Sequence, residues 1–387
     1  MINRLKMVST CAVSFLLLVS LAACGDPTAT TAPAATTAAA SGVTTVATGA
    51  TTAASASGAT TVANAAPSGD TAALYEAAKK EGKLVWYTVW FNQDVVNDIG
   101  TAFSAKYPGL KVEGTRNVAA TMYQKLTQEM QAGIKNVDIY GTTDMGQMIE
   151  LKEQGKLTAY TPEGKDAIIA DYRSLDPENF YHTGSLSPLL ITYNTQKAKA
   201  EDLPKSWQDL ISDKNKDKIS TGSAAASGQV GTWALSMQQK YGWEAYFNKL
   251  NGLNPKLGRS INDTVVDIVS GERSLAIGPM GQVLASKAKG NPVDVIYPTD
   301  GTIVVVNPVG ILKDAPHPAT AKLFMNFLMS KEYAELCAKN YEQPLRSDVT
   351  ISGAKTLKEI PTYSPKPADI RKDLPDIIKK WKTVFGA

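Results

Sequence analysis

The sequence is poor in the residue types that build metal centres and disulfides. It has three cysteines and two histidines among 387 residues. In an exported chain Cys337 would have no partner for an internal disulfide, and the helical pattern around it indicates a small core residue. His182 and His317 lie far apart and fit no metal-ligand spacing such as H-E-x-x-H. We therefore expect no metal and no other cofactor.

The sequence also has no large excess of positive or negative charge. Of the 40 Lys and Arg, Arg4 and Lys6 lie in the leader described below, and the other 38 nearly balance the 37 Asp and Glu. Without a block of basic residues, nucleic acid is not an expected partner. Ser286 and Lys289 fit an S-x-x-K pattern, but no S-D-N or K-T-G motif accompanies them. No glycine loop of the nucleotide-binding kinds occurs either, so the sequence gives little support to an enzyme.

The N-terminus has the pattern of an export signal. An apolar run from Met7 to Ser20 follows Arg4 and Lys6, and it is shorter than the roughly 20 residues of a membrane span. Small residues then precede Cys24, which resembles the bacterial lipobox, where the cysteine receives lipid and becomes the new N-terminus. We predict a lipoprotein signal peptide over residues 1–23 and a lipid anchor at Cys24 that holds the protein on the outer face of the cell membrane. An ordinary signal peptide with a chance cysteine is the alternative.

Residues 24–70 are predicted to be a tether. Almost all are Ala, Thr, Ser, Gly, Val or Pro, and Asp26 is the only charged residue before Asp70. Such a segment buries too little apolar surface to offset its conformational entropy, so we expect it to be disordered. As a flexible coil it would span about 35–40 Å.

From residue 71 onward, strand and helix patterns alternate, which predicts an α/β fold with sheets covered by helices. The chain is long enough for two lobes. Strands are predicted at 83–88, 110–115, 137–141, 186–193, 218–221, 274–278, 293–297, 303–306 and 309–312. Helices are predicted at 72–81, 94–107, 121–132, 145–153, 228–241, 243–250, 263–270, 282–289, 318–329, 331–340 and 366–385. The last of these is basic and amphipathic; we expect it to dock on the domain, with a membrane-surface helix as the alternative.

Several segments resemble the type 2 periplasmic binding proteins of the ferric-iron and phosphonate branch, also called solute-binding protein family 1. They extend from about Leu74 to Arg346, in the same order as in the family. The matching segments are LYEAAKKEGKLVWYT (74–88), AKYPG (105–109), SPLLITYNT (187–195), PKSWQDL (204–210), VSGE (269–272), APHP (315–318) and AKLF (321–324). The resemblance implies two lobes, each a mainly parallel sheet flanked by helices, joined by crossing hinge strands. We expect a first lobe at 71–190, a second at 191–305 and a return to the first at 306–387.

The resemblance also implies a function. It predicts an extracytoplasmic, non-enzymatic substrate-binding lipoprotein of an ABC importer. Such a protein captures a small anionic solute (an organic phosphate, a phosphonate or a carboxylate) in the cleft between its lobes. It then delivers the solute to a permease that has a cytoplasmic ATPase, and we expect it to act as a monomer. A ferric-iron-binding protein is the alternative, and a secreted hydrolase is a weaker one.

Iron-binding members of this family place adjacent tyrosines after a strand like 275–278. Here Met280 and its neighbours take that position, and no tyrosine is among Pro279, Gly281 and Gln282. Ferric iron prefers hard oxygen ligands such as phenolates, so this departure counts against iron. Met280 is nevertheless expected at the ligand.

The first wall of the expected cleft follows the ends of three strands, because ligands of parallel sheets bind beyond the carboxyl ends. It comprises Thr88, Trp90, Arg116, Thr143 and Asp144. Trp90 and Phe91, just past the end of the first strand, could stack on an organic ligand or pack the edge of the lobe. Arg116 could pair with an anion or with a surface carboxylate.

The second wall is predicted where the strand at 218–221 leads into the helix at 228–241. The run from Ser223 through Ala226 and Ser227 to Gly228 is small and uncharged, and a helix N-terminus offers unpaired amides to an anion. A plain helix cap with a flexible lead-in is the alternative. The resemblance places the ligand at this junction, with Arg259, Ser260 and Asn262 closing the same side.

Overall fold

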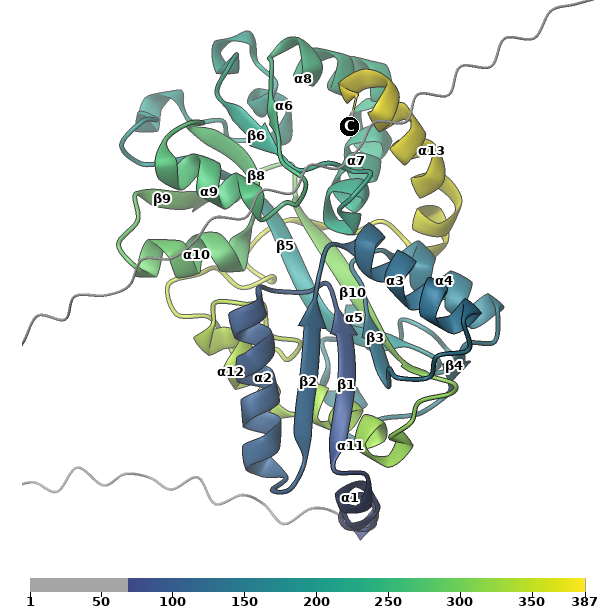
Figure 1. The fold of residues 1–387 in the computed structure, drawn as a ribbon. Coiled ribbons are helices and arrows are strands. Elements are labelled where there is room, and N and C mark those ends of the chain that lie inside the picture. Colours follow the sequence, from purple (N-terminus) through teal and green to yellow (C-terminus); the bar gives the residue numbers. More distant parts are fainter. Residues whose placement is uncertain (1–68, 387) are drawn as a thin grey trace, which may run out of the picture. The chain divides into compact units, whose positions relative to one another are not determined.

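One continuous sheet passes through both lobes of the protein, and helices cover it (Figure 1). The computed structural model describes residues 69–386. The predicted signal peptide, Cys24 and nearly all of the tether lie outside the described residues. The main path through the sheet has the strand order β2-β1-β3-β10-β5-β8-β6-β7.

In the first lobe, β1 (Lys83–Thr88) lies between β2 (Lys111–Arg116) and β3 (Ile139–Gly141), and all three strands are parallel. The short β4 (Leu157–Thr158) pairs with β10. The carboxyl ends of β1 to β3 therefore meet at one edge, as the strand pattern predicts. The helices of this part are α1 (Gly69–Glu81), α2 (Gln93–Lys106), α3 (Ala119–Gln131), α4 (Met145–Glu153) and α5 (Ala170–Arg173).

The second lobe repeats this plan on a smaller scale. Its central strand β6 (Ile219–Thr221) lies between β7 (Lys256–Leu257) and β8 (Leu275–Pro279), again in parallel, while β9 (Val293–Ile296) runs antiparallel to β5. The helices are α6 (Trp207–Leu210), α7 (Gly228–Tyr241), a π-helical turn at Glu244–Asn248, α8 (Lys249–Gly252), α9 (Asp263–Ser270) and α10 (Met280–Ala288).

Two long antiparallel strands, β5 (His182–Asn194) and β10 (Thr302–Leu312), join the lobes. Their register shifts between Asn307 and Pro308, where a proline has no N–H for the ladder. The buried Asn307 amide stabilises this point, because it donates to the hydroxyls of Ser185 and Ser187, each at 2.8 Å. The two-lobed α/β fold with crossing strands is thus confirmed. Both strands are longer than predicted, and β10 unites two separate apolar runs.

The C-terminal part does not stay with one lobe. Helices α11 (Pro318–Leu328) and α12 (Lys331–Lys339) return to the first lobe, where α11 packs on α1 and β1. The chain then crosses back, and β11 (Thr362–Tyr363) pairs with the start of β10. Helix α13 (Pro367–Phe385) packs against both α4 and α7 (Figure 1). Its apolar face is buried through Leu374, Ile377 and Trp381, so the predicted docking on the domain is confirmed.

Helix starts follow the capping residues of the sequence. Ser206 accepts a hydrogen bond from the Asp209 amide at 3.0 Å, and Asn92 accepts one from the Val95 amide at 3.0 Å. Among the helices of residues 69–386, none combines the length and apolarity that a bilayer crossing requires.

Candidate ligand-binding cleft

A small cavity lies between the two lobes, beside the crossing strands. The first lobe contributes Val89 and Phe91 from the loop after β1. The crossing strand β5 contributes Ser187 and Pro188. The remaining lining residues come from the second lobe and from the segment after α12: Gln229, Asn262, Pro279, Met280, Gly281, Gln282 and Glu342. The cavity thus occupies the place where the strand pattern predicts a ligand.

Three helices of the second lobe begin at this cavity. Gln229 is the second residue of α7, Asn262 precedes α9, and Pro279 precedes α10. A helix N-terminus carries roughly half a positive charge and several unpaired N–H groups. The convergence of three such ends gives this wall a positive potential although it contains no basic side chain.

The loop before α7 holds the predicted anion-binding segment. Ser223 orders it: the Ser223 carbonyl accepts the amides of Ala226 at 3.2 Å and Ser227 at 2.9 Å, and its hydroxyl accepts the Ala225 amide. The Ser227 amide is therefore not one of the unpaired amides that the sequence predicts at this helix N-terminus. Within residues 69–386, the amides of Gly228 and Gln229 have no acceptor, so free donors begin one residue later.

The lobes touch on the α7 side of the cavity. The Ala120 amide donates to the Ala226 carbonyl at 3.4 Å, and Arg259, an exposed residue, donates to the Thr121 hydroxyl at 2.6 Å. Gly228 faces Thr143 so closely that a Cβ there would lie 2.5 Å from the Thr143 carbonyl oxygen. The Gly228 position therefore requires glycine in this closed arrangement.

Thr88 and Trp90 are both fully buried in the first lobe. The Thr88 hydroxyl accepts the Trp90 amide at 3.2 Å, and the Trp90 indole donates to the Thr142 carbonyl at 3.0 Å. Gly184 leaves space for the indole, because a Cβ there would lie 1.9 Å from the ring. Of the two interpretations of Trp90, this placement fits packing; Phe91, the next residue, faces the cavity instead.

Arg116 lies behind Phe91, and its Nε donates to the Phe91 carbonyl at 3.2 Å. Burial lowers the pKa of the guanidinium, and the negative charge of Asp263 in the second lobe opposes that shift. Arg116 is thus a half-buried cation that faces the other lobe without a direct ion pair among the described residues.

Thr143 and Asp144 end the first-lobe wall. Thr143 is buried, and the Asp144 carboxylate caps α4 by accepting the Gly146 amide at 2.9 Å. Burial raises the pKa of Asp144 to about 6, against the amide hydrogen bonds that lower it. Ser260 is also bonded locally: its amide donates to Asp263 and its hydroxyl accepts the Asn262 amide. Of the predicted site residues, Asn262 and Met280 line the cavity directly.

Glu342 is the cavity residue that the sequence did not reveal. It follows α12, in a segment where Tyr341 has a φ of 62° and Gln343 bridges to Leu186 of β5. Only 8% of Glu342 is exposed, and its Oε2 lies against Gly281 at the start of α10. Burial raises the pKa of its carboxyl to about 8. The residue lies outside any helical or strand periodicity, so no local pattern marks it.

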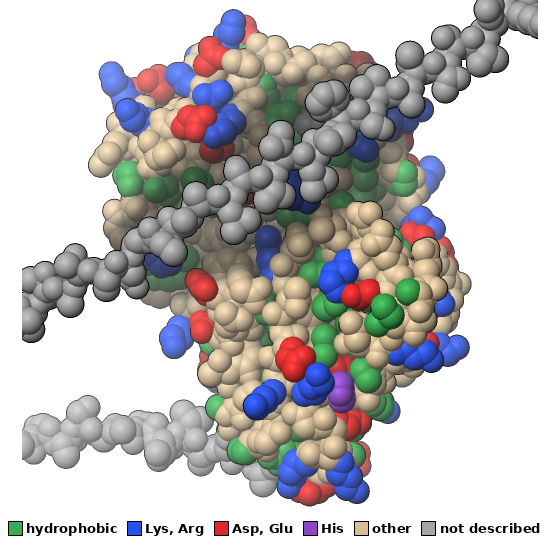
Figure 2. All heavy atoms as spheres, viewed as in Figure 1, with side chains coloured by type: hydrophobic (Ala, Val, Ile, Leu, Met, Phe, Trp, Pro, Cys, Tyr) green, Lys and Arg blue, Asp and Glu red, His purple; other side chains and the backbone are tan. Residues whose placement is uncertain are grey.

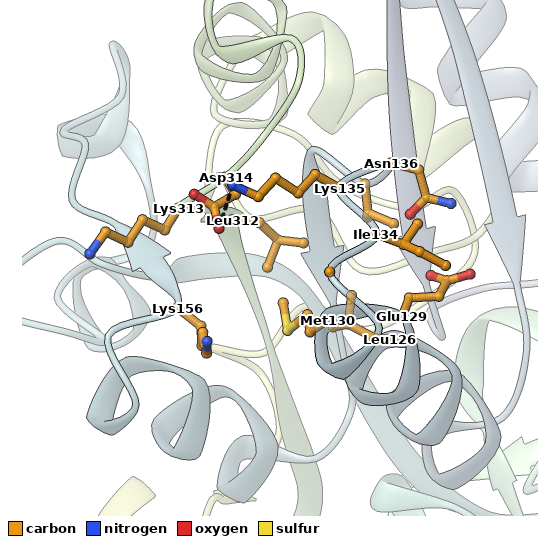
Figure 3. Close-up of a pocket in the computed structure, with 12 residues that line it drawn as sticks. Leu126, Glu129, Met130, Ile134, Lys135, Asn136, Lys156, Leu312, Lys313 and Asp314 are labelled. Atoms are coloured by element: carbon orange, nitrogen blue, oxygen red, sulfur yellow. Dashed lines mark ion pairs between the residues drawn. The ribbon is translucent and has the colours of Figure 1, made fainter.

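A second hollow lies elsewhere in the first lobe, between the end of α3 and the end of β10 (Figure 3). Lys135 and Asp314 pair across it at 3.5 Å. Its residues precede β3 and follow β10, so it is at the amino end of the parallel strands, where ligands of such sheets do not bind. Elsewhere on the face shown in Figure 2, acidic and basic side chains are interspersed rather than gathered by sign.

Metal ligands do not gather in the described part of the chain. Residues 69–386 contain no group of three or more His, Cys, Asp or Glu placed to hold a metal ion. The imidazole of His317 instead contacts the Asp138 carboxylate at 2.9 Å, beside the start of α11. Buried His182 contacts the Tyr160 carbonyl at 2.7 Å. Both histidines therefore have structural partners.

The chain is similar in sequence to bacterial solute-binding proteins. Residues 136–365 match the model of the family described as bacterial extracellular solute-binding protein. The chain is 27% identical over 225 residues to the "Putative 2-aminoethylphosphonate-binding periplasmic protein" of Salmonella typhimurium, a match that spans 54% of this chain and 66% of that protein. It is 26% identical over 278 residues to iron uptake protein A1 of Synechocystis sp., spanning 68% of this chain and 75% of that protein.

A solved structure shares the fold. It is that of the periplasmic binding protein AfuA from Actinobacillus pleuropneumoniae, with exogenous fructose-6-phosphate bound. The TM-score is 0.70 at 23% identity, and the likeness covers 79% of this chain and 99% of that one. At this identity the likeness establishes the two-lobed architecture alone.

Proposed function

The chain belongs to the family of bacterial extracellular solute-binding proteins, and we propose that it captures a small anionic solute for an ABC importer. The solute class is an organic phosphate, a phosphonate or a carboxylate. The protein binds it in the cleft between the lobes without turnover and, acting as a monomer, delivers it to the membrane permease. The relatives named for 2-aminoethylphosphonate and the structure with fructose-6-phosphate support this class.

One observation carries the proposal: three helix N-termini begin at the interlobe cavity. Free amides at the start of α7 and the dipoles of α7, α9 and α10 favour a negative charge there. Arg116 does not line the cavity, but it lies behind Phe91 in the facing lobe and is half-buried, so its positive charge is poorly screened and favours an anion in the cleft.

The test is a thermal-shift screen followed by calorimetry. Phosphate, alkylphosphonates, phosphate esters and carboxylates are compared with uncharged analogues, and at least one anion should raise the melting temperature. Arg116→Ala should then weaken that anion about tenfold, or ~1.4 kcal/mol. Lys111→Ala is the matched control, because it removes an exposed positive charge from the other end of the same strand. Equal affinity in both variants would remove Arg116 from the site.

We also propose that Cys24 carries the lipid that anchors the protein to the outer face of the membrane. The lipobox-like sequence and the family's extracellular character support this placement. Stable anchoring needs two or more acyl chains, because one chain binds a membrane only marginally. Cys24→Ala should therefore shift the protein to the soluble extracytoplasmic fraction. A mutant that stays on membranes through a high-salt wash would contradict the anchor.

Ferric iron is the second candidate, favoured by the similarity to iron uptake protein A1. The residues at the start of α10 include no phenolate, which is the reason to rank iron below an anion. Titration with ferric citrate separates the two. A strong visible phenolate-to-iron band would restore the iron assignment, and its absence together with anion binding would remove it.

A further inference from the structure

The Glu342 carboxylate lines the cleft without a charged neighbour among the lining residues. Of the residues that line the interlobe cavity, it is the only one with an ionisable side chain. Residues 69–386 provide no hydrogen bond and no ion pair to its carboxylate oxygens. With 8% of the residue exposed, Glu342 is more than nine-tenths buried, and it lines the cavity.

An isolated buried carboxylate is costly, so a structural role would provide partners for it. None of the elements around Glu342 does so. Helix α10 approaches with Gly281, and a Cβ there would lie 2.6 Å from Oε2, which means that the glycine keeps room for the carboxylate. The titratable neighbours are Tyr333, Cys337 and Tyr341; burial raises the pKa of the first two, so both are neutral near pH 7.

We propose that Glu342 receives a protonated amine of the bound solute, so that the cleft selects anions that also carry an ammonium group. The inference rests on the proposed function and sharpens it. The free amides at the start of α7, beside Gln229, hold the anionic end, and Glu342 pairs with the cationic end within the same cavity. Such a ligand is a compact zwitterion, and both of its charges gain a partner on leaving water.

The proposal predicts a coupling between ligand and proton. In the empty site burial raises the pKa of Glu342 to about 8, so at pH 7 the carboxyl is mostly protonated. A nearby ammonium favours the charged form and lowers this pKa. Binding of an aminated anion therefore releases a proton, whereas an anion without the amine favours the protonated carboxyl and takes one up when the pH is near 8.

The experiment compares 2-aminoethylphosphonate with ethylphosphonate, which lacks the amine. Affinities are measured by calorimetry at pH 6.5, 7.5 and 8.5 for the natural chain, for Glu342→Gln and for Glu335→Gln. Glu335 is an exposed carboxylate on α12, so its substitution is a control for net charge. The ligands' own ionisation is the same for every variant, so the ratio of natural to Glu342→Gln affinity isolates Glu342.

At pH 8.5 the natural chain should bind 2-aminoethylphosphonate about 10- to 100-fold more tightly than Glu342→Gln does, the range of a charge-assisted hydrogen bond. That ratio should increase from pH 6.5 to 8.5, and for ethylphosphonate it should fall. Calorimetry in two buffers of different ionisation enthalpy measures the protons released on binding, and the difference between the natural chain and Glu342→Gln is the part that comes from Glu342. Glu342→Gln should also melt no lower than the natural chain, because it removes an unpaired buried carboxyl.

The inference is overturned if Glu342→Gln binds 2-aminoethylphosphonate as tightly as the natural chain, or if both release the same number of protons on binding it. If both phosphonates bind tightly and Glu342→Gln changes neither affinity, the proposal of anion capture is retained and only the amine site is rejected. If neither phosphonate nor any anion of the thermal-shift screen binds, the proposed function fails and this inference falls with it.

Discussion

On the first-lobe wall of the cleft, the polar groups at the strand ends bond to their own lobe, whereas on the second-lobe wall the amides that begin α7 have no acceptor. Thr88 accepts the Trp90 amide, and Asp144 caps α4. Across the cleft, Gly228 and Gln229 present free N–H groups. Both walls lie at the carboxyl ends of parallel strands, yet local hydrogen bonds leave mainly the second one free for a ligand. The position in the fold indicates which surface can face a ligand. The N–H groups without an acceptor then indicate which part of that surface is available to bind it.

The largest effect expected from this contrast is on stability. Trp90→Ala should lower the free energy of unfolding by about 3–5 kcal/mol, because the indole is fully buried and fills the space beside Gly184. Ligand affinity of the folded fraction should stay within twofold. Urea unfolding and calorimetry below the transition measure the two quantities. A selective loss of affinity with native stability would mean that Trp90 contacts the ligand.

Gly228→Ala should lower ligand affinity and leave stability unchanged, the reverse of the effect expected for Trp90→Ala. A Cβ at this position would meet the Thr143 carbonyl at 2.5 Å, so α7 could not approach the first lobe and the closed cleft would be lost. We expect affinity to fall about tenfold, or ~1.4 kcal/mol. The melting temperature without ligand should not fall, since alanine favours a helix over glycine.

Gly252→Ala is the matched control for that substitution. It also lies in a helix, and its Cβ would meet nothing within 4 Å. Ligand affinity should be unchanged in this variant. If Gly228→Ala binds as well as Gly252→Ala, the contact between α7 and Thr143 is not part of the ligand-bound state.

Thr88→Val should give the smallest change. The substitution removes the acceptor of the Trp90 amide and leaves that buried N–H unpaired, which costs about 1 kcal/mol of stability. Because the hydroxyl serves the lobe rather than the cleft, affinity should change less than twofold. Equilibrium unfolding measures the stability and calorimetry measures the affinity. A loss of binding free energy larger than the loss of stability would mean that Thr88 contacts the ligand.

Most of the fold follows from periodicity and helix-ending residues. The predicted bounds of β1, α4, α7 and α9 match the structure, because glycines with positive φ mark them locally: Gly82 precedes β1, and Gly155, Gly242 and Gly271 follow the helices. The crossing strands were predicted too short, since β5 and β10 hold each other through pairing between residues more than a hundred positions apart. Such pairing is invisible in a local window.

The site was predictable only in outline. The strand-end rule indicates the loop before α7 and the residues around Asn262, but it cannot tell that Ser223 already accepts the Ser227 amide. Nor can it find Glu342, which comes to the cavity from a segment far along the chain. Tertiary contacts determine which backbone donors are free and which distant carboxylate lines the same cavity. A single sequence does not reveal these contacts.

Helix α13 has a mechanical consequence for the two lobes. It contacts α4 through the pair of Arg371 and Glu153 at 2.8 Å, and α7 through Lys380 and Gln238 at 3.0 Å. Besides the crossing strands, this helix is thus a further place where the lobes are held together. Any relative movement of the lobes has to be accommodated by the contacts of this nineteen-residue helix, although none of its residues lines the cavity.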